Sequence, residues 1–205
     1  MENYYFNKAK FIKSIVDVKE APWGFDSSVL FVGKSNVGKS SLINALTNSK
    51  KLAYTSSKPG HTRVLNYYSV EDYFYLVDCP GYGFSTKKEL DYAFYGKMIE
   101  NYFKDNEHLK LVVFLLDSRH EPTDDDLDFY KFLLSYKYRF IICMTKCDKL
   151  NMSMRSKIYK NLKAKLEFDP EKYPPLLVSI NDKKSILRLK ELIEGVVKEN
   201  KWLWH

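Results

Sequence analysis

A short segment near the start of the chain combines glycine, lysine and serine at a spacing suited to phosphate chemistry. It runs Gly33-Lys34-Ser35-Asn36-Val37-Gly38-Lys39-Ser40 and follows the apolar residues 29–32. The glycines let backbone N–H groups turn inward around a polyphosphate, Lys39 supplies a mobile cation for the β and γ oxygens, and Ser40 presents a hydroxyl to Mg²⁺. The pattern predicts a strand, a phosphate-binding loop and then a helix that includes Ser41.

A second motif, Asp78-Cys79-Pro80-Gly81, ends a run of strand-like residues. The carboxyl ends of strands in a doubly wound sheet border the crevice where ligands bind. There, Asp78 would hold Mg²⁺ through water and the Gly81 N–H would sense a γ-phosphate. An isolated Asp-x-x-Gly is also a common turn, but its distance from the phosphate loop favours the nucleotide site.

A third motif, Thr145-Lys146-Cys147-Asp148, ends the strand-like residues 140–144 and is followed by Lys149. An aspartate in this position can accept hydrogen bonds from N1–H and the 2-amino group of guanine, while the lysine stem packs on the purine. Adenine presents a different edge and leaves the carboxylate without those donors. In register with the first two motifs, this segment favours GTP over ATP.

The last predicted strand ends in Val178-Ser179-Ile180-Asn181, where a backbone N–H can contact the guanine carbonyl. A loop between the first helix and the next strand contains Pro59-Gly60-His61-Thr62-Arg63. If this loop is mobile, the Thr62 hydroxyl can reach Mg²⁺ only when a γ-phosphate is bound. The alternative for Thr62 is an ordinary turn residue. Lys39 and Thr62 are the predicted catalytic residues.

Strand-like and helix-like segments alternate along the chain without a repeat or linker. This alternation predicts a mostly parallel, doubly wound sheet, with one antiparallel edge strand because two predicted strands are joined by only two residues. The expected strands are 29–32, 64–70, 73–78, 111–117, 140–144 and 176–179. The expected helices begin at 41, 86, 123, 153 and 185, the second of them with a Thr86/Glu89 capping box.

Composition sets broader limits. The chain has 205 residues, an apolar fraction of 45% and a formal net charge of +7. That length predicts one domain, residues 1–205, and the absence of a long apolar run predicts a cytoplasmic protein without a membrane partner. The positive charge is consistent with a polyanionic partner, and equally with solvated lysines. The cysteines at 79, 143 and 147 lack metal-ligand spacing.

These motifs together resemble the EngB (YihA/YsxC) family of bacterial ribosome-biogenesis GTPases. The resemblance extends over residues 11–197 and depends on the phosphate loop through Asn44, Thr55-Ser56 with 59–62, 77–83, and Asp117-Ser118-Arg119-His120-Glu121-Pro122-Thr123. The last segment has no role in generic GTP binding, so it is the most family-specific.

The resemblance implies a Ras-like P-loop GTPase fold, Mg²⁺ as cofactor, slow hydrolysis of GTP to GDP, and assembly of the large ribosomal subunit, with its precursor particle and rRNA as partners. It also implies a part in cell division and septation, and a monomer is expected. Two departures are noted: His61-Thr62-Arg63 stands where the family usually has Arg-Thr-Gln, and Lys34 replaces an arginine.

The residue after Gly81 is Tyr82, where many small GTPases carry a water-orienting glutamine, so hydrolysis by the isolated protein is expected to be slow. Asn36 resembles a phosphate-loop asparagine that helps hold K⁺ in related GTPases; the alternative is a side chain that stabilises the loop. The sequence leaves two rival functions open. One is a binding module that uses GTP or GDP without hydrolysis, and the other is a P-loop ATPase or nucleotide kinase.

Overall fold

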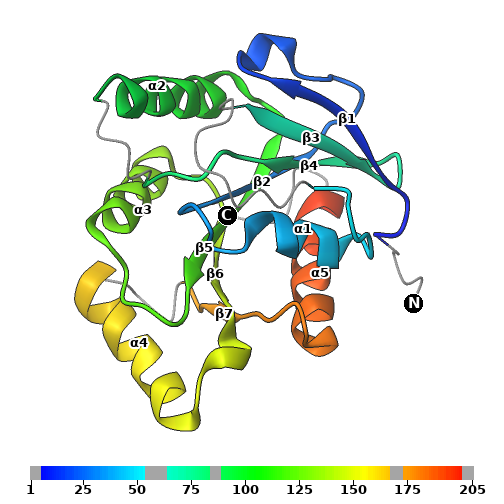
Figure 1. Ribbon diagram of the computed structural model, residues 1–205. Coiled ribbons are helices and arrows are strands. Elements are labelled where there is room, and N and C mark those ends of the chain that lie inside the picture. Colours follow the sequence, from blue (N-terminus) through cyan, green and yellow to red (C-terminus); the bar gives the residue numbers. More distant parts are fainter. Residues whose placement is uncertain (1–5, 54–63, 84–88, 167–172, 200–205) are drawn as a thin grey trace.

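The computed structural model describes residues 6–53, 64–83, 89–166 and 173–199, which build one seven-stranded sheet flanked by helices (Figure 1). The spatial order of the strands is β1-β3-β4-β2-β5-β6-β7. Their bounds are β1 (Ala9–Ile15), β2 (Ser28–Gly33), β3 (Leu65–Val70), β4 (Phe74–Asp78), β5 (Leu109–Asp117), β6 (Phe140–Thr145) and β7 (Leu176–Leu177).

Helices cover both faces of the sheet. One face packs against α1 and α5, and the other against α2, α3 and α4, so the core forms two hydrophobic clusters. The bounds are α1 (Lys39–Leu46), α2 (Glu89–Asp105), α3 (Asp124–Tyr136), α4 (Met152–Leu166) and α5 (Lys183–Lys198), with 3-10 turns η1 (Val18–Glu20) and η2 (Cys147–Lys149).

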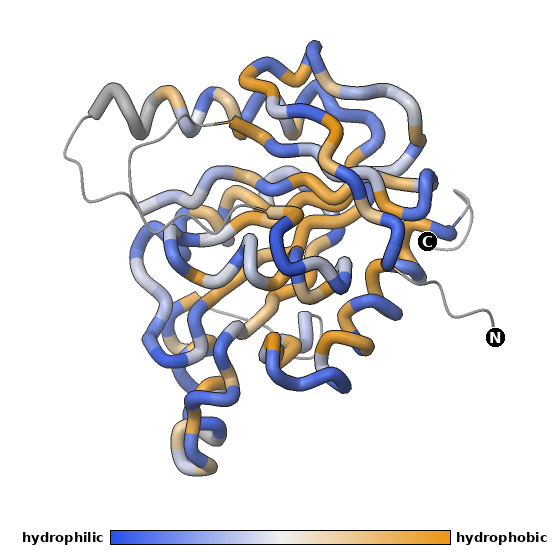
Figure 2. The backbone as a smooth tube through the Cα atoms, turned by 45° about the vertical axis from the view of Figure 1, so that its right-hand side comes forward, coloured by the Kyte–Doolittle hydropathy of each residue, from blue (hydrophilic) through white to orange (hydrophobic). Residues whose placement is uncertain are grey.

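The central strands are apolar almost throughout because both of their faces are covered. Every residue of β2 is buried, and β5 is buried from Leu111 to Leu116. In Figure 2 the strands therefore form a hydrophobic centre, while the helices alternate between hydrophilic and hydrophobic along their length. The buried stripe of α5 consists of Ile186, Leu189, Ile193 and Val197, at the spacing of one helical face.

The predicted fold class is confirmed: β2, β4, β5, β6 and β7 pair in parallel, and β3 is antiparallel to β4. The edge position predicted for that reversed strand is wrong. Residues 9–15 form β1, which was not predicted, and β1 pairs antiparallel with β3 and lies outside it. Only Ile15 of β1 is buried, so its sequence carries little of the alternation that identifies a half-buried strand.

The other elements lie within a few residues of their predicted bounds. β7 is two residues long where four were predicted, and α5 begins two residues earlier than predicted. Thr86 lies outside the described residues, so the predicted capping box is not described, but the helix that it was to open is present from Glu89. Within the described residues, no helix is both long enough and apolar enough to cross a membrane.

Candidate nucleotide-binding site

The phosphate-loop segment connects β2 to α1 as predicted. Two of its residues have positive φ, Asn36 at 64° and Gly38 at 105°, and Gly38 is the residue before the first turn of α1. Left-handed backbone is inexpensive for glycine and tolerated by asparagine. The chain therefore reverses tightly at the carboxyl edge of the sheet, and Lys39, Ser40 and Ser41 form the N-terminal turn of α1.

Two glycines are required by close packing. A Cβ on Gly33 would lie 2.7 Å from the carbonyl oxygen of Leu115, and a Cβ on Gly81 would lie 2.8 Å from the backbone nitrogen of Ser35. The Ser35 N–H also donates to the Tyr82 carbonyl at 3.0 Å. The Asp78–Gly81 segment and the phosphate loop are therefore held against each other, as the nucleotide hypothesis requires.

Lys39, Ser40 and Asp78 form one cluster. The Lys39 ammonium lies 2.7 Å from Asp78 Oδ1, and the Ser40 hydroxyl donates to Asp78 Oδ2 at 3.0 Å. The side chains of Lys39 and Asp78 are only 12% and 7% exposed, so their attraction is weakly screened by water. The cation and the two oxygen groups predicted to act on phosphate and Mg²⁺ are thus in direct contact with one another.

Tyr82 does not face the phosphate loop. Its ring stacks on Phe129 of α3 at a centroid distance of 5.4 Å, and its hydroxyl donates to Asp126 Oδ1 at 2.7 Å. Burial and the nearby Asp126 carboxylate raise its pKa well above the usual value. A side chain held in this way is not free to orient a water molecule at the phosphates.

Lys34 also points towards α3 rather than into the loop. Its ammonium lies 3.4 Å from the Thr123 hydroxyl and 3.9 Å from Asp125. The side chain of Cys79, another predicted site residue, is buried 3.6 Å from the Tyr95 hydroxyl, and burial raises its pKa to about 12. The Cys79 N–H donates to the Phe31 carbonyl. Cys79 therefore shapes the backbone between Asp78 and Pro80 without presenting a polar group of its side chain to a ligand.

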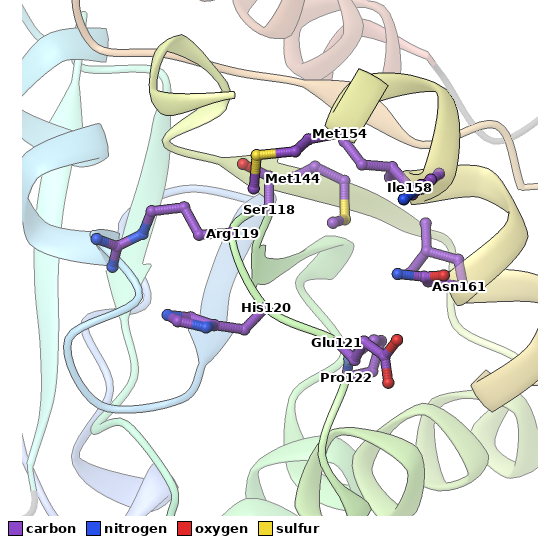
Figure 3. A pocket seen from close by; sticks show the side chains of 11 residues that line it. Ser118, Arg119, His120, Glu121, Pro122, Met144, Met154, Ile158 and Asn161 are labelled. Carbon is purple, nitrogen blue, oxygen red and sulfur yellow. The ribbon is translucent and has the colours of Figure 1, made fainter. Parts of the chain in front are cut away.

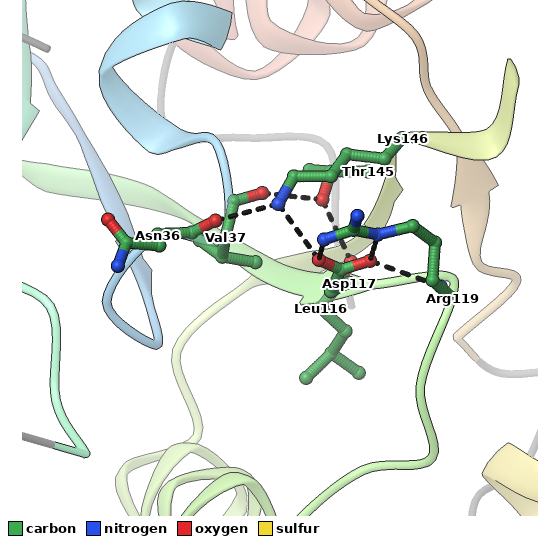
Figure 4. A network of polar contacts seen from close by, with 7 residues as sticks. All are labelled: Asn36, Val37, Leu116, Asp117, Arg119, Thr145 and Lys146. Atoms are coloured by element: carbon green, nitrogen blue, oxygen red, sulfur yellow. Dashed lines mark hydrogen bonds and ion pairs between the residues drawn. The ribbon is translucent and has the colours of Figure 1, made fainter. Parts of the chain in front are cut away.

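The guanine-motif loop, residues 145–149, is hydrogen-bonded directly to the phosphate loop (Figure 4). The Thr145 hydroxyl donates to the carbonyls of Val37 at 2.7 Å and Leu116 at 3.2 Å, and the Lys146 ammonium donates to the carbonyl of Asn36 at 2.7 Å. In the same view the Asn36 side chain points away from Lys146. Two motifs more than a hundred residues apart in sequence thus form one continuous surface.

Asp148 lies at the end of this surface with both carboxylate oxygens directed by neighbouring side chains. The Ser179 hydroxyl donates to Oδ1 at 2.8 Å and the Asn181 amide to Oδ2 at 3.3 Å, while Lys149 lies 3.5 Å away. The hydrogen bond from Ser179 is the main reason why the pKa of Asp148 lies below its usual range. The carboxylate is therefore charged and oriented at neutral pH, ready to accept hydrogen bonds.

The hydrogen bonds of the loop after β7 indicate which backbone N–H could donate to the guanine carbonyl. The N–H groups of Ser179 and Asn181 already donate to the hydroxyls of Ser185 and Ser179. Among the described residues, none accepts a hydrogen bond from the N–H of Ile180, whose side chain is 53% exposed. Val178 and Cys147 are buried and bonded to each other through their backbones. Of the predicted segment, Ile180 is therefore the residue that offers a donor.

Asp117 was not predicted as a site residue, yet it contacts the site directly. Its Oδ2 accepts a hydrogen bond from Lys146 at 2.9 Å, and the Arg119 guanidinium donates hydrogen bonds to both of its oxygens (Figure 4). The segment that was expected to have no role in generic GTP binding therefore contacts the loop of the third motif. The sequence held one signal: residues that end adjacent parallel strands lie side by side, and Asp117 pairs in register with Thr145.

The predicted residues Pro59, Gly60, His61 and Thr62 lie outside the described residues. Their loop leaves the described structure after Ala53 and returns at Val64, directly before β3. Ala53 is itself held by the Asn44 side chain of α1, which bonds to both its N–H and its carbonyl. The contribution of Thr62 to the site stays a prediction.

Comparison with known proteins gives a consistent result. The family model described as 50S ribosome-binding GTPase matches residues 28–146. A probable GTP-binding protein EngB from Clostridium kluyveri is 47% identical over 156 residues, which cover 76% of this chain and 78% of that protein. A probable GTP-binding protein EngB from an Exiguobacterium species is 43% identical over 164 residues, 80% of this chain and 83% of that protein.

Solved structures agree. The crystal structure of a probable GTP-binding protein EngB superimposes with a TM-score of 0.68 at 26% identity, covering 85% of this chain and all of that one. Aquifex aeolicus Era bound to GDP and aluminium fluoride gives 0.59 at 25% identity, covering 87% of this chain and 59% of that one. The matched family model spans all three motifs up to Lys146. The chain belongs to the EngB family of P-loop GTP-binding proteins.

Proposed function

We propose that this chain binds GTP and GDP at the carboxyl edge of its sheet and slowly hydrolyses GTP, acting as a switch in the assembly of the large ribosomal subunit. The observation that carries the proposal is a direct connection between a group of side chains suited to phosphate and a carboxylate suited to guanine. A Lys39–Asp78–Ser40 cluster suited to phosphate and metal is joined through Lys146 and Asn36 to a charged, oriented Asp148 suited to guanine.

The phosphates would occupy the loop from Gly33 to Ser41, whose N–H groups surround the N-terminus of α1. Nucleotide binding would exchange one set of partners for another: Lys39 would leave Asp78 for the β and γ oxygens, and Asp78 would become free to face a cation. In the structure the charges of Lys39 and Asp78 compensate each other, so neither is left buried and unpaired. Binding would thus break the Lys39–Asp78 ion pair.

Mg²⁺ fits the groups present. P-loop GTPases generally use it, and Ser40 and Asp78 place a hydroxyl and a carboxylate, both hard oxygen donors, 3.0 Å apart. Mg²⁺ usually keeps several waters and takes its other ligands from phosphate, so two protein oxygens are a suitable contribution. Thr62 would add a hydroxyl when GTP is bound. The ion would neutralise charge that develops on the phosphates during hydrolysis.

Guanine would lie between the Lys146 stem and the loop after β7. Asp148 would accept from N1–H and the 2-amino group, and the Ile180 N–H would donate to the carbonyl of the base. Ser179 would act through Asp148, whose Oδ1 it holds at 2.8 Å. The conformation of this loop would be held by Thr145, Cys147, Lys149 and Val178. The hydrogen bond from Thr145 to the Val37 carbonyl would connect the base subsite to the phosphate subsite.

The hydrolytic machinery would consist of positioning and charge stabilisation by Lys39 and Thr62, with the Gly81 N–H and the loop 59–62 responding to the γ-phosphate. The burial of Tyr82 supports a slow intrinsic rate, because the position that holds glutamine in faster enzymes is occupied by a core side chain. The same observation favours one alternative, a GTP-dependent binding module that does not hydrolyse its ligand.

A competition assay tests the nucleotide assignment. GTP, GDP and ATP would be titrated against a fluorescent GDP analogue bound to the protein in Mg²⁺ buffer. We expect GTP and GDP to displace the analogue at concentrations at least ~100-fold below those needed for ATP, since an unpaired carboxylate rejects the wrong base strongly. Equal displacement by ATP would contradict the proposal. Release of phosphate from GTP over hours then separates hydrolysis from the non-hydrolysing alternative.

Potassium is part of the same proposal. The Asn36 side chain would help to hold K⁺ beside the β and γ oxygens, in a position where positive charge favours hydrolysis. We expect faster phosphate release in potassium than in sodium buffer, and no difference between the two salts for Asn36→Ala. Equal rates in both salts for the unchanged protein would remove potassium from the mechanism.

The ribosomal role rests on the family and on the net charge of +7. A cytoplasmic, monomeric protein would bind large-subunit precursor particles through rRNA, and its effect on cell division would follow from ribosome assembly. Cosedimentation with large-subunit particles is expected to be stronger with a non-hydrolysable GTP analogue than with GDP. It should also fall steeply with salt, because phosphate contacts release counterions. Binding that ignores both variables would contradict the switch.

A further inference from the structure

We propose that Asp117, clamped by Arg119, is a positioning residue for Lys146 and so controls how long a guanine nucleotide stays bound. The inference depends on the proposed function, because it deepens the role of one of its binding loops. It starts from a carboxylate that the fold places between two cations at the end of β5.

The Asp117 carboxylate is fully occupied. Its Oδ1 accepts from the N–H of Arg119 at 3.1 Å and from Nε at 2.9 Å, and its Oδ2 accepts from an Arg119 terminal nitrogen at 2.8 Å and from Lys146 Nζ at 2.9 Å. A bidentate guanidinium fixes the plane of a carboxylate as well as its position. Arg119 therefore determines the direction in which Oδ2 faces Lys146.

Lys146 is held at both ends. Its backbone is in the left-handed region at φ 59°, and its ammonium lies between Asp117 and the Asn36 carbonyl. A free lysine side chain has many rotamers, and ordering it on ligand binding would cost free energy. Here contacts within the protein itself hold the stem stretched across the loop. The network pre-organises the surface on which the purine would stack.

The segment that carries Asp117 and Arg119 is fixed to the guanine-motif loop. The Ser118 N–H donates to the Thr145 carbonyl at 3.0 Å. Figure 3 shows Ser118 and Arg119 at the margin of a cleft of about 150 Å³ against α4, with the Arg119 guanidinium directed away from that cleft. The guanidinium thus contributes to the Asp117 network rather than to the packing against α4.

A double-mutant cycle tests the inference. In Asp117→Ala, Lys146 and Arg119 would face each other as like charges, and release of a fluorescent GDP analogue is expected to accelerate by about tenfold, the effect of losing one charge-assisted hydrogen bond. In a Lys146→Met background the same change should alter release by less than about twofold, because the effect acts through the ammonium. Asp117→Asn, which keeps an acceptor but not the charge, should lie in between.

Controls separate this role from general stability. Arg139→Ala removes an arginine–carboxylate pair, with Glu199, next to β6 at the opposite end from the site, and should leave release unchanged; thermal unfolding is followed for every variant. If Asp117→Ala does not fold, Asp117→Asn carries the cycle. Unchanged release, or equal acceleration in both backgrounds, would overturn the positioning role and leave GTP binding standing. An unchanged protein that binds no guanine nucleotide would instead overturn the proposed function.

Discussion

Among single residues, Lys39 differs most from what its motif predicts, because its ammonium lies in a buried ion pair. Its spacing in the phosphate loop predicts a mobile cation, but in the structure its side chain is only 12% exposed and its ammonium pairs with Asp78, whose side chain is 7% exposed. Removing one partner of such a pair leaves an uncompensated charge. The consequences of mutating Lys39 therefore extend beyond its affinity for phosphate.

We expect Lys39→Ala to abolish or strongly weaken GTP binding and also to lower the free energy of unfolding by ~3 kcal/mol, as breaking buried ion pairs does. Adding Asp78→Asn should restore much of the lost stability, because the unpaired carboxylate is gone, without restoring binding. Urea unfolding and nucleotide titration measure the two effects. A double variant that is less stable than Lys39→Ala would show that the pair is not the source of the loss.

The Asp117 carboxylate gives a prediction about pH. Its burial disfavours the charged form, but the hydrogen bonds from Arg119 and Lys146 outweigh burial and hold the pKa well below its usual range. A depressed folded-state pKa adds stability above the unfolded value of about 3.9, and this contribution is lost as the pH falls below it. The stability difference between the unchanged protein and Asp117→Asn should therefore shrink from about pH 6 to pH 3. A stability difference between the two proteins that grows as the pH falls would contradict this role of the Asp117 charge.

The motif residues were predictable from sequence because each motif has a fixed local geometry. Asp117 was harder, because its contact with Lys146 joins segments about 30 residues apart. The segment with Ser179 was predicted, but the hydrogen bond from its hydroxyl to Asp148 was not, for the same reason. Only the register of β5 with β6 brings Asp117 level with Thr145. A sequence pattern identifies the residues that touch a ligand more readily than those that hold them in place.

At the scale of elements, the phosphate loop and the Asp78–Gly81 segment depend on a backbone contact that admits no side chain. Gly81→Ala would place a Cβ 2.8 Å from the backbone of Ser35 and should displace the loop, weakening nucleotide binding and stability. Gly96 in α2 is the matched control. A Cβ added to Gly96 would meet no atom within 4 Å, and Gly96→Ala should stabilise the helix by ~0.5–1 kcal/mol. Thermal unfolding and GDP titration distinguish the two; equal effects would contradict the packing argument.

The parallel strands were predicted because burial on both faces makes them continuous apolar runs. β1 was missed for the opposite reason: Phe11 and Ile12 are 52% and 41% exposed, and the pairing with β3 shifts register between Phe11 and Lys13. Such a strand is defined by its hydrogen bonds to β3 rather than by its own pattern. The edge of the sheet is therefore the part of this fold that the sequence leaves least determined.

At the scale of the whole molecule, the sheet joins both hydrophobic clusters, so a single domain is expected to unfold as one unit. Thermal unfolding followed by tryptophan fluorescence and by circular dichroism should show one coincident transition. GDP at 100 times its dissociation constant should raise stability by ~2.7 kcal/mol. Two separate transitions would contradict the single-domain proposal.

We propose that Asp148 makes this molecule select guanine, and a single titration tests that role. In Asp148→Asn the amide can donate to the oxygen that replaces the 2-amino group of guanine in xanthine. The affinities of the unchanged protein and of Asp148→Asn for GDP and for xanthosine diphosphate would be measured under identical conditions. We expect the unchanged protein to prefer GDP and the variant to prefer xanthosine diphosphate. A variant that still prefers GDP would contradict it.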